Sequence, residues 1–396
     1  MKIQLKHGDN QDRLPARPKI KRCAITPLLA LACLLLPLAA FAQFPATAYG
    51  WNLGNTLEAN CEGCWAPAAT QALINQVSAS GFNTIRIPVN WSNHMNTQNV
   101  IDPAWLARVK QVVDWCLAEN MTVIINMHHD SWFDSCGFRR FDQKLNAKYV
   151  KVWQQIAQSF QAYDSRLMFC AANEPQVDTA AKTAVLKQYY QNFINTVRST
   201  GGNNANRWLI LPGPDTNIDK TYDWFTLPTD PTPGRLAVDV HYYDPFNFCL
   251  MENDESWGQF SYFWGSQVAG YRTSVPSLLH RNTAWGEEDW LADQIAKMKT
   301  KFVDNGVPVM FGEFAAGKRI DYPELTGVEY TRHLASRTYF DKKVVELCNA
   351  NGIKPYFWDN GWDGRMGFSL FNRATATVID QPGITALTGG AALPPP

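Results

Sequence analysis

Eight short β-rich runs alternate with longer amphipathic segments along this chain, and that alternation constrains the fold more than any other feature. The runs are mostly apolar, as expected of strands buried on both faces. Strands that alternate with helices form parallel sheets, and eight such units predict a single α/β domain with a (β/α)8 (TIM) barrel fold. The expected strands are YGWNLGN, NTIRIPV, MTVIINMHH, RLMFCAANE, RWLILPG, LAVDVHYY, VPVMFGEF and IKPYFWDN, with helices near 67–80, 102–119, 143–162, 179–199, 219–225, 288–305 and 327–350.

The first 42 residues are expected to be a secretory signal peptide. Residues 1–22 carry seven Lys and Arg against two Asp, and an apolar stretch then runs to a small-x-small pattern at Ala40-Phe41-Ala42. Pro27 and Pro37 interrupt the stretch, which argues against a membrane span. We therefore expect a secreted, extracellular or periplasmic enzyme with a catalytic domain over 43–380 and a disordered, Pro- and Gly-rich tail over 381–396.

Charge excludes one class of partner. The 36 Lys and Arg less the seven of the leader leave 29, and the 36 Asp and Glu less two leave 34, so the mature chain has a net charge of about −5. A mildly acidic surface argues against nucleic acid. No repeat or linker divides the chain, and we expect a monomer that has neither a membrane partner nor a cofactor.

Seven cysteines remain after the leader, so at least one thiol should be unpaired. Cys116, Cys170 and Cys348 lie within apolar patterns and are expected in the core. The remaining four lie in expected loops and are the disulfide candidates: Cys61, Cys64, Cys136 and Cys249.

Polar and aromatic residues gather where the expected strands end, which is where (β/α)8 barrels carry their active sites. In chain order they are Asn55, His128, His129, Asn173, Glu174, His241, Tyr243, Glu313 and Trp358. Glu174 and Glu313 each follow a buried apolar run, where a carboxylate is costly unless it faces a polar cleft.

Two carboxylic acids in different surroundings can divide acid and nucleophile work, as in glycoside hydrolysis. A retaining mechanism predicts a separation of roughly 5–5.5 Å. Arg86, which alternates inward on its strand, is a candidate to keep a nucleophilic carboxylate ionised. His241 and Tyr243 lie two apart and so share a face, with Tyr243 expected to donate to the nucleophile.

Two further patterns bear on the site. Adjacent residues on a strand point oppositely, so His128 and His129 are not expected to chelate one metal, although a metal-dependent hydrolase using them with Asp130 or His241 stays a competing reading. Fifteen tryptophans suggest stacking on sugar rings. Those in or beside expected catalytic-face loops are Trp91, Trp132, Trp257, Trp264, Trp285, Trp358 and Trp362.

Over nearly all of residues 47–372 the chain resembles glycoside hydrolase family 5, through GWNLGNTLEA, GFNTIRIPVNW, VIINMHHD, NEP, HYYDPFNF, FGEF and YFWDNG. The resemblance implies Glu174 as acid/base, Glu313 as nucleophile, Asn173 as the ligand of the 2-hydroxyl and Trp358 as the platform under the cleaved sugar. It puts Arg86, His128, His241 and Tyr243 at supporting positions. In FCAANEP the residues before the Asn differ from those of many family members, which have a glutamate and a bulkier residue there.

The expected function is a secreted retaining endo-β-1,4-glucanase (cellulase) acting on a β-linked polysaccharide without a cofactor or metal. Mannan, xyloglucan, lichenan and xylan stay open as substrates, because loops rather than the catalytic pair decide specificity. The insertion Asp244–Glu287 is the expected specificity element. A barrel that binds carbohydrate without catalysis is a further alternative, against which both glutamates argue.

Overall fold

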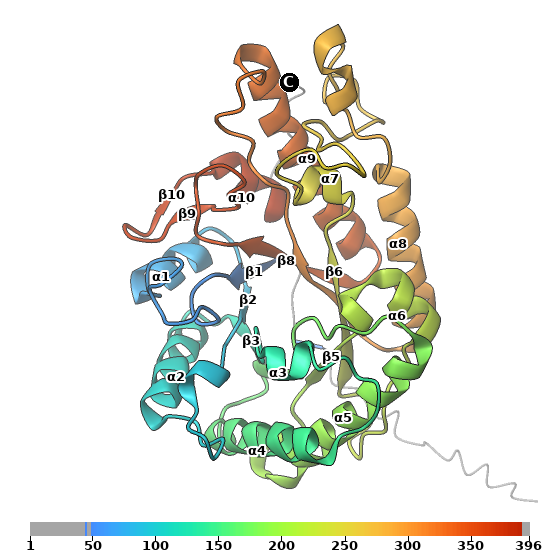
Figure 1. Cartoon of the computed structure of the whole chain (residues 1–396). Coiled ribbons are helices and arrows are strands. Elements are labelled where there is room, and N and C mark those ends of the chain that lie inside the picture. The colour runs from blue at the N-terminus through green and yellow to red at the C-terminus, as the bar shows by residue number, and fades with distance from the viewer. Residues whose placement is uncertain (1–43, 46–48, 390–396) are drawn as a thin grey trace, which may run out of the picture. The chain divides into compact units, whose positions relative to one another are not determined.

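The computed structural model describes residues 44–45 and 49–389, and it confirms the (β/α)8 barrel. Eight parallel strands close in sequence order, β1 pairing with both β2 and β8 (Figure 1). Each strand falls within its expected run. Their bounds are β1 (Gly50–Leu53), β2 (Thr84–Ile87), β3 (Thr122–Asn126), β4 (Leu167–Cys170), β5 (Leu209–Pro212), β6 (Leu236–Tyr242), β7 (Val309–Phe314) and β8 (Ile353–Asp359).

The expected helices are present within a few residues of their predicted ends and surround the barrel (Figure 1). They are α1 (Gln71–Ala79), α2 (Pro103–Ala118), α4 (Gln143–Ser159), α5 (Ala180–Ser199), α6 (Ile218–Trp224), α8 (Glu288–Lys301) and α9 (Gly327–Ala350). The sequence did not indicate three short helices: α3 (Ser131–Asp134), α7 (Phe246–Cys249) and α10 (Gln381–Leu387). A small hairpin of β9 (Phe371–Asn372) and β10 (Thr377–Val378) follows the barrel.

Helix starts follow the local sequence. The Asp102 carboxylate accepts from the Ala104 N–H at the start of α2, and Pro103 occupies the first helical turn, as predicted. Asp142 and Thr179 cap α4 and α5 in the same way. Each cap satisfies an N–H group that the helix itself leaves unpaired, which fixes where the helix begins.

Alternation along the strands divides the core into two layers. Side chains such as Ile85 and Ile87 point outward and pack against the helices in the main cluster. Inward side chains form a second cluster inside the barrel, which includes Ile124, Met168 and Met310. Phe44 and Trp208 belong to this inner cluster, and their rings meet edge to face at 4.9 Å. Side chains therefore fill the barrel, and polar groups gather above them at the carboxyl ends of the strands.

The insertion after β6 shares a small separate core with the segment between β7 and α9. Five of its seven buried apolar side chains come from the insertion, Met251, Phe260 and Leu278 among them, and Tyr322 and Leu325 come from the later segment. The Arg281 guanidinium lies 3.8 Å from the centroid of the Phe260 ring and pairs with Asp254 at 2.6 Å. This packing makes the insertion an ordered part of the catalytic face.

The predicted boundary at residue 380 is wrong, because α10 lies beyond it. Ile384 and Leu387 on α10 are buried. Asp380 caps the helix through the Gly383 N–H and pairs with Arg337 of α9 at 2.7 Å. The buried apolar residues of α10 and its Asp380 cap explain why this segment is helical, although its small-residue composition suggested disorder. The signal-peptide prediction and the end of the predicted tail, residues 390–396, lie outside the described residues.

The cysteines divide partly as expected. Cys61 and Cys64 form a disulfide, whereas Cys116, Cys170 and Cys348 are unpaired and buried in the core, as predicted. Two disulfide candidates are wrong. Cys136 is a free exposed thiol, and Cys249 is a free buried thiol because α7 turns it into the core. In the described part of the chain, no helix has the length and apolar character needed to cross a membrane.

Packing of α10 gives a stability prediction. Ile384→Ala should lower the free energy of unfolding by about 2–5 kcal/mol, because it leaves a cavity beneath α10, which packs on α9. Chemical denaturation of full-length protein measures this, with exposed Gln381→Ala on the same helix as the control. Equal stability of the two variants would show that α10 is not packed.

Candidate active site

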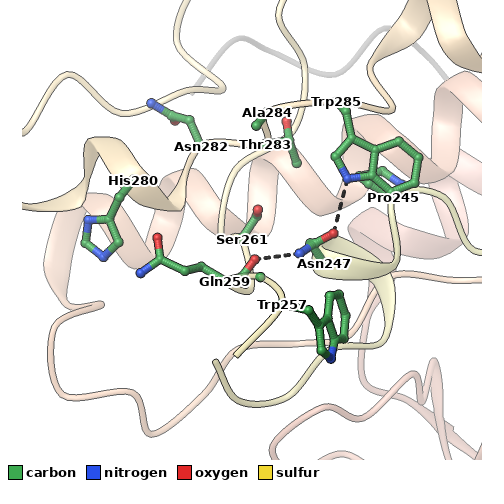
Figure 2. Close-up of a pocket in the computed structure, with 11 residues that line it drawn as sticks. Pro245, Asn247, Trp257, Gln259, Ser261, His280, Asn282, Thr283, Ala284 and Trp285 are labelled. Carbon is green, nitrogen blue, oxygen red and sulfur yellow. Dashed lines mark hydrogen bonds between the residues drawn. The ribbon is translucent and has the colours of Figure 1, made fainter. Parts of the chain in front are cut away.

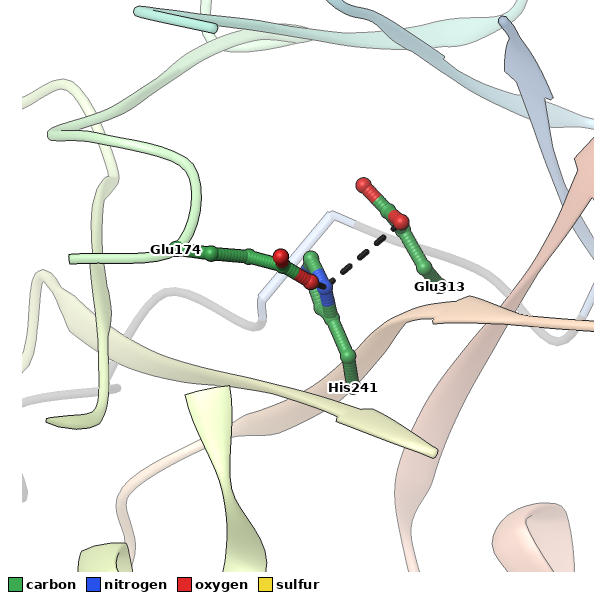
Figure 3. A group of neighbouring side chains, drawn as sticks. All are labelled: Glu174, His241 and Glu313. Carbon is green, nitrogen blue, oxygen red and sulfur yellow. Dashed lines mark hydrogen bonds and ion pairs between the residues drawn. The ribbon is translucent and has the colours of Figure 1, made fainter. Parts of the chain in front are cut away.

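Glu174 and Glu313 converge at the mouth of the barrel with His241 between them (Figure 3). Glu174 follows β4, His241 lies near the end of β6, and Glu313 lies on β7. One carboxylate oxygen of each glutamate and one ring nitrogen of His241 all lie within 4.8 Å of one another. Two carboxyl groups this close match the retaining arrangement and are closer than the roughly 6.5–9.5 Å of inverting enzymes.

Two donors hold the Glu313 carboxylate. Arg86 Nη1 donates to Oε1 at 2.9 Å, and the Tyr243 hydroxyl donates to Oε2 at 3.1 Å, as predicted for Tyr243. The Glu313 side chain is only 7% exposed. Burial raises the pKa of Glu313, whereas the charges of His241 and Arg86 oppose that shift. Both oxygens are therefore fixed in direction before any ligand binds.

A bulge in β7 aims Glu313 into the barrel mouth. The register between β6 and β7 shifts at His241, and the Gly312 peptide leaves the regular ladder. Asp239 accepts from the Gly312 N–H at 2.9 Å, and Asn52 Nδ2 donates to the Gly312 carbonyl at 2.9 Å. A Cβ on Gly312 would meet Asp239 Oδ1 at 2.2 Å, which explains the glycine in FGEF.

From inside the barrel, Arg86 of β2 connects β1, β7 and the segment that follows β4. Its guanidinium is fully buried and donates to Asn52 at 2.9 Å, to Asn173 at 2.7 Å and to Glu313. Burial lowers the pKa of Arg86, but Glu313 and Asp239 more than offset that effect and raise it. Arg86 therefore stays charged and fixes Asn173 and Glu313 relative to each other.

Glu174 has different surroundings. Its side chain is 47% exposed, and Oε1 accepts from His241 Nδ1 at 2.6 Å. Although burial acts to raise the pKa of Glu174, the hydrogen bond and charge of His241 lower it. Thr216 Oγ1 lies 3.5 Å from the same oxygen. Glu174 thus faces open space beside a proton donor, whereas Glu313 is buried and held.

His241 is surrounded by carboxylates. Burial alone would lower its pKa, but Glu313, Asp239 and Glu174 raise it to about 10. The Nδ1 atom lies 3.6 Å from Glu313 Oε2, and Nε2 lies 3.8 Å from Asp239 Oδ2. At neutral pH the ring is therefore a cation that Glu174 and Glu313 share.

An aromatic rim is formed by residues of β8 and of the segments that follow β3 and β1. Trp358 of β8 stacks on His128 with ring centroids 5.7 Å apart and an interplanar angle of 12°. His129 meets His128 edge to face at 4.4 Å, and exposed Trp65 meets His129 at 5.5 Å. A Cβ on Gly54 would come within 2.9 Å of the Trp358 ring, so that ring needs glycine beneath it.

The histidine pair does not lie on a strand. β3 ends at Asn126, whose side chain accepts from the Val89 N–H at 3.2 Å and contacts His128 Nδ1 at 3.1 Å. His129 then adopts a left-handed backbone with φ of 55°. The prediction that the two rings point oppositely is therefore wrong. Burial lowers the pKa of both rings, most strongly for His128, which stays neutral.

Asn55 follows β1 as predicted, but its backbone braces the loop. Its N–H donates to the Glu58 carboxylate, and its carbonyl accepts from the Ala66 N–H at 3.1 Å. Burial raises the pKa of Glu58 to about 7, although the N–H groups of Asn55 and Thr56 donate to its carboxylate. Asn55 lies at the rim, and no side-chain contact joins it to the glutamates in the part of the chain described.

The predicted metal alternative does not match the geometry. Asp130 is buried and accepts from Ser92, Trp132 and the Trp91 N–H, so it braces a loop. In the described residues, the cluster with metal-like spacing is instead Glu174, His241 and Glu313. These three groups do not fit a cation. His241 Nδ1 carries a proton directed at Glu174, and Arg86 and Tyr243 already occupy the Glu313 oxygens.

Sequence reasoning missed three residues of the site and misjudged two tryptophans. Asp239 lies two positions before His241 on one strand face, a spacing that signals its role, and Asn52 occupies a similar position in β1. Trp65 carries no such signal. Trp91 and Trp264 are fully buried packing residues, contrary to the stacking prediction, whereas Trp257, Trp285 and Trp362 are exposed.

Comparison with known proteins decides the family. The model of the family described as cellulase (glycosyl hydrolase family 5) matches residues 48–364. The chain belongs to glycosyl hydrolase family 5. Endoglucanase A of Paenibacillus barcinonensis is 37% identical over 86% of the chain and 87% of its own length, and a xyloglucan-specific endo-β-1,4-glucanase of Bacteroides ovatus is 32% identical over 86% and 68%.

Solved structures agree with this assignment. A family 5 xyloglucanase from Paenibacillus pabuli, in complex with ligand, superposes with a TM-score of 0.77 at 37% identity. The alignment covers 88% of this chain and 98% of that one. The chain is therefore a glycoside hydrolase, and its two clustered glutamates lie where (β/α)8 enzymes carry their active sites.

The charge on His241 is directly measurable. NMR titration of its ring should show a protonated imidazole at neutral pH that loses its proton near pH 10. Buried His333, whose pKa burial lowers to about 3, should stay neutral as an internal control. Because the folded pKa lies above the unfolded value of about 6.5, the stabilisation is complete below that pH and lost as the pH rises toward 10. Titration of His241 near its unfolded value would contradict this charge network.

Proposed function

We propose that this chain is a retaining endo-β-1,4-glucanase in which Glu313 is the nucleophile and Glu174 the acid/base. The observation that carries the proposal is the pair itself, two carboxyl groups within 4.8 Å in unlike surroundings. A nucleophile must be ionised and aimed, which suits Glu313 between Arg86 and Tyr243. An acid must reach the leaving oxygen and exchange protons, which suits the half-exposed Glu174 beside His241.

In the first step a Glu313 oxygen attacks the anomeric carbon while the glycosidic bond breaks. The leaving oxygen takes the proton that Glu174 and His241 hold between Oε1 and Nδ1. His241 lowers the pKa of Glu174 through its hydrogen bond and its charge, so the proton rests on His241 Nδ1 and reaches the leaving oxygen through Glu174 Oε1. The products of this step are a glycosyl ester on Glu313 and a free sugar hydroxyl.

In the second step water enters on the side of Glu174. Esterification has removed the charge of Glu313, so Glu174 is more readily ionised and can accept a proton from the water. The hydroxide attacks the anomeric carbon, the ester bond breaks, and Glu313 leaves as a carboxylate. The proton returns to the Glu174–His241 pair, so the net reaction consumes one water per bond cleaved.

Other side chains are proposed to hold the sugar that is cleaved. Asn173 Oδ1 accepts from Arg86, so its Nδ2 amide is the donor proposed for the 2-hydroxyl. Trp358, stacked on neutral His128, is proposed as the platform under the ring. His129 and Asn55 line the rim beside it.

The substrate proposed is a β-1,4-linked glucan. Support comes from relatives named as endoglucanases, one of them 37% identical over most of the chain. Xyloglucan is the second candidate, favoured by the equal identity of the Paenibacillus pabuli xyloglucanase over 98% of its length. We also propose that the enzyme is secreted, works as a monomer and needs neither cofactor nor metal, with no nucleic acid or membrane partner.

Azide rescue tests the roles of the two glutamates. Glu174→Ala should lose roughly 10²–10⁴-fold in kcat/KM on natural glucan, while an activated aryl glycoside still forms the glycosyl-enzyme. Added azide needs no base, so it should restore turnover and release a β-glycosyl azide. In Glu313→Ala azide attacks the substrate directly and should give the α-azide, whereas Glu313→Gln should fail on every substrate. The opposite anomers would mean that the roles are reversed.

Substrate preference is tested by reducing-sugar release in parallel. Carboxymethylcellulose, xyloglucan, lichenan, glucomannan and xylan are assayed with wild-type enzyme and with Glu313→Gln as the blank. Unbranched β-1,4-glucan and xyloglucan should both be cleaved, and their kcat/KM ratio separates the two candidates. Cleavage of xylan or mannan alone would refute the glucanase assignment.

A further inference from the structure

Two cavities formed by segments that follow β-strands differ in charge. The cavity in the insertion after β6 has a volume of about 540 Å³, and none of its described lining residues is Lys, Arg, Asp or Glu (Figure 2). A second cavity, of about 510 Å³, lies between the segment that follows β3 and the start of α4. We call the second cavity the basic pocket. Its positively charged lining residues are Arg139, Arg140, Lys144 and Lys148.

Carboxylates do not balance the charge of the basic pocket. In the described part of the chain, none of its four cations forms an ion pair with Asp or Glu. Asp142, the acidic residue of the lining, caps α4 by accepting from the N–H groups of Lys144 and Leu145 at 2.8 and 2.9 Å. Lys144 and Lys148 lie four apart on α4, a spacing at which like charges repel. Residues 43–396 carry 29 Lys and Arg against 34 Asp and Glu, yet unpaired cations gather in this cavity.

The two arginines lie in a loop that is anchored on both sides. Phe138, directly before them, is buried, and its ring meets that of Tyr189 edge to face with centroids 6.0 Å apart. Phe141, directly after them, packs on the same tyrosine at 4.8 Å. Phe138 also has a left-handed backbone, with φ of 45°, which costs energy for a bulky side chain. The backbone of Arg139 and Arg140 is therefore held before a ligand binds, which lowers the entropy cost of binding.

The basic pocket lies on the same face as the catalytic pair. The segment after β3 leaves the carboxyl end of that strand, where a (β/α)8 barrel carries its site. Within it, the Asp134 carbonyl accepts from the Gln176 N–H at 2.8 Å. Gln176 is two residues after Glu174, and Asp134 is two residues before Cys136 of the pocket lining, so each pair of Cα atoms is within about 7.6 Å. The pocket is thus a neighbour of Glu174 on the face that receives polysaccharide.

The chemistry of the lining selects a carboxylate. A guanidinium can donate two parallel hydrogen bonds to a carboxylate, and a lysine adds charge without a fixed geometry. A neutral glucan has no group that uses four cations. Phosphate would also attract them, but the polymers that reach the catalytic face of a glycoside hydrolase are polysaccharides. In a polysaccharide, the sugars that carry a carboxylate are uronates.

We propose that the basic pocket binds uronate sugars of an acidic polysaccharide that accompanies the glucan, through its four cations. The pocket would hold the enzyme on a charged polymer while the catalytic cleft acts on a neutral one. This inference goes beyond the proposed function, because it adds a second site and does not depend on the roles of Glu174 and Glu313.

Calorimetric titration with tetragalacturonate tests the proposal, and its methyl ester is the neutral match. The enzyme should bind the acid and not the ester, with an affinity that falls as the salt concentration rises. Arg139→Ala and Arg140→Ala should each weaken this binding about tenfold, equivalent to about 1.4 kcal/mol, and leave cellohexaose kinetics unchanged. Lys299→Ala, which removes a cation from α8, is the matched control and should bind as the wild type does.

Cys136 provides a second measurement, because it lines the pocket. Its thiol is free and exposed, whereas the other free cysteines of the described residues are buried. Tetragalacturonate should slow the alkylation of Cys136 by iodoacetamide, a neutral reagent, and the methyl ester should not. Mass spectrometry of the peptide that contains Cys136 measures the extent of labelling.

The outcomes separate this inference from the proposed function. Equal binding of the acid and the ester would overturn it, and so would full affinity in a variant that lacks both arginines. Displacement of tetragalacturonate by cellohexaose in inactive Glu313→Gln would overturn it by placing the acid in the cleft. Inorganic phosphate that binds as tightly and protects Cys136 equally would overturn the uronate assignment. An enzyme that binds tetragalacturonate as described but cleaves no glucan would refute the proposed function alone.

Discussion

The rest of the structure depends on the ion pair between the buried Arg86 guanidinium and the Glu313 carboxylate inside the barrel. Burying the charge of Arg86 is costly unless an anion and hydrogen-bond acceptors lie close by. Glu313 provides the anion, and Asn52 and Asn173 accept further hydrogen bonds from the two Nη atoms, while Nε has no acceptor among the described residues. The same contacts hold β1, β2, β7 and the end of β4 in one relative position. The fold and the site therefore depend on the same contact, because the Glu313 carboxylate that pairs with Arg86 is also the proposed nucleophile.

Charge balance around His241 explains how two glutamates in one cleft differ. His241 and Arg86 are cations facing Asp239, Glu174 and Glu313. Arg86 pairs with Glu313 (Nη1 to Oε1, 2.9 Å), and His241 pairs with Glu174 (Nδ1 to Oε1, 2.6 Å). Asp239 supports both pairs. It accepts a hydrogen bond from the Gly312 N–H, next to Glu313, and it lies beside His241 Nε2. The two glutamates therefore differ in pKa because they have different charged neighbours, and the strand on which each residue lies determines those neighbours.

Much of this was predictable because the period-2 and strand–helix patterns are local in sequence. The barrel, Arg86 pointing inward and the polar residues at strand ends follow from that alternation. What the sequence could not give depends on contacts between distant segments. Asn52 and Asp239 take their roles from a bulge in β7, α10 is ordered by Arg337, and the His128–His129 backbone bends because Asn126 ends β3. The insertion after β6 has no repeating pattern, so its pocket could not be foreseen.

The division of labour between Glu313 and Glu174 is the central claim, and trapping the covalent intermediate tests it most directly. A 2-deoxy-2-fluoro cellobiosyl fluoride forms the glycosyl ester quickly and releases it slowly, so the labelled residue accumulates. Proteolysis and tandem mass spectrometry should find the sugar on Glu313, in the peptide that contains FGEF. A label on Glu174 would reverse the roles. An enzyme that consumes the reagent without ever carrying a label would contradict the double displacement altogether.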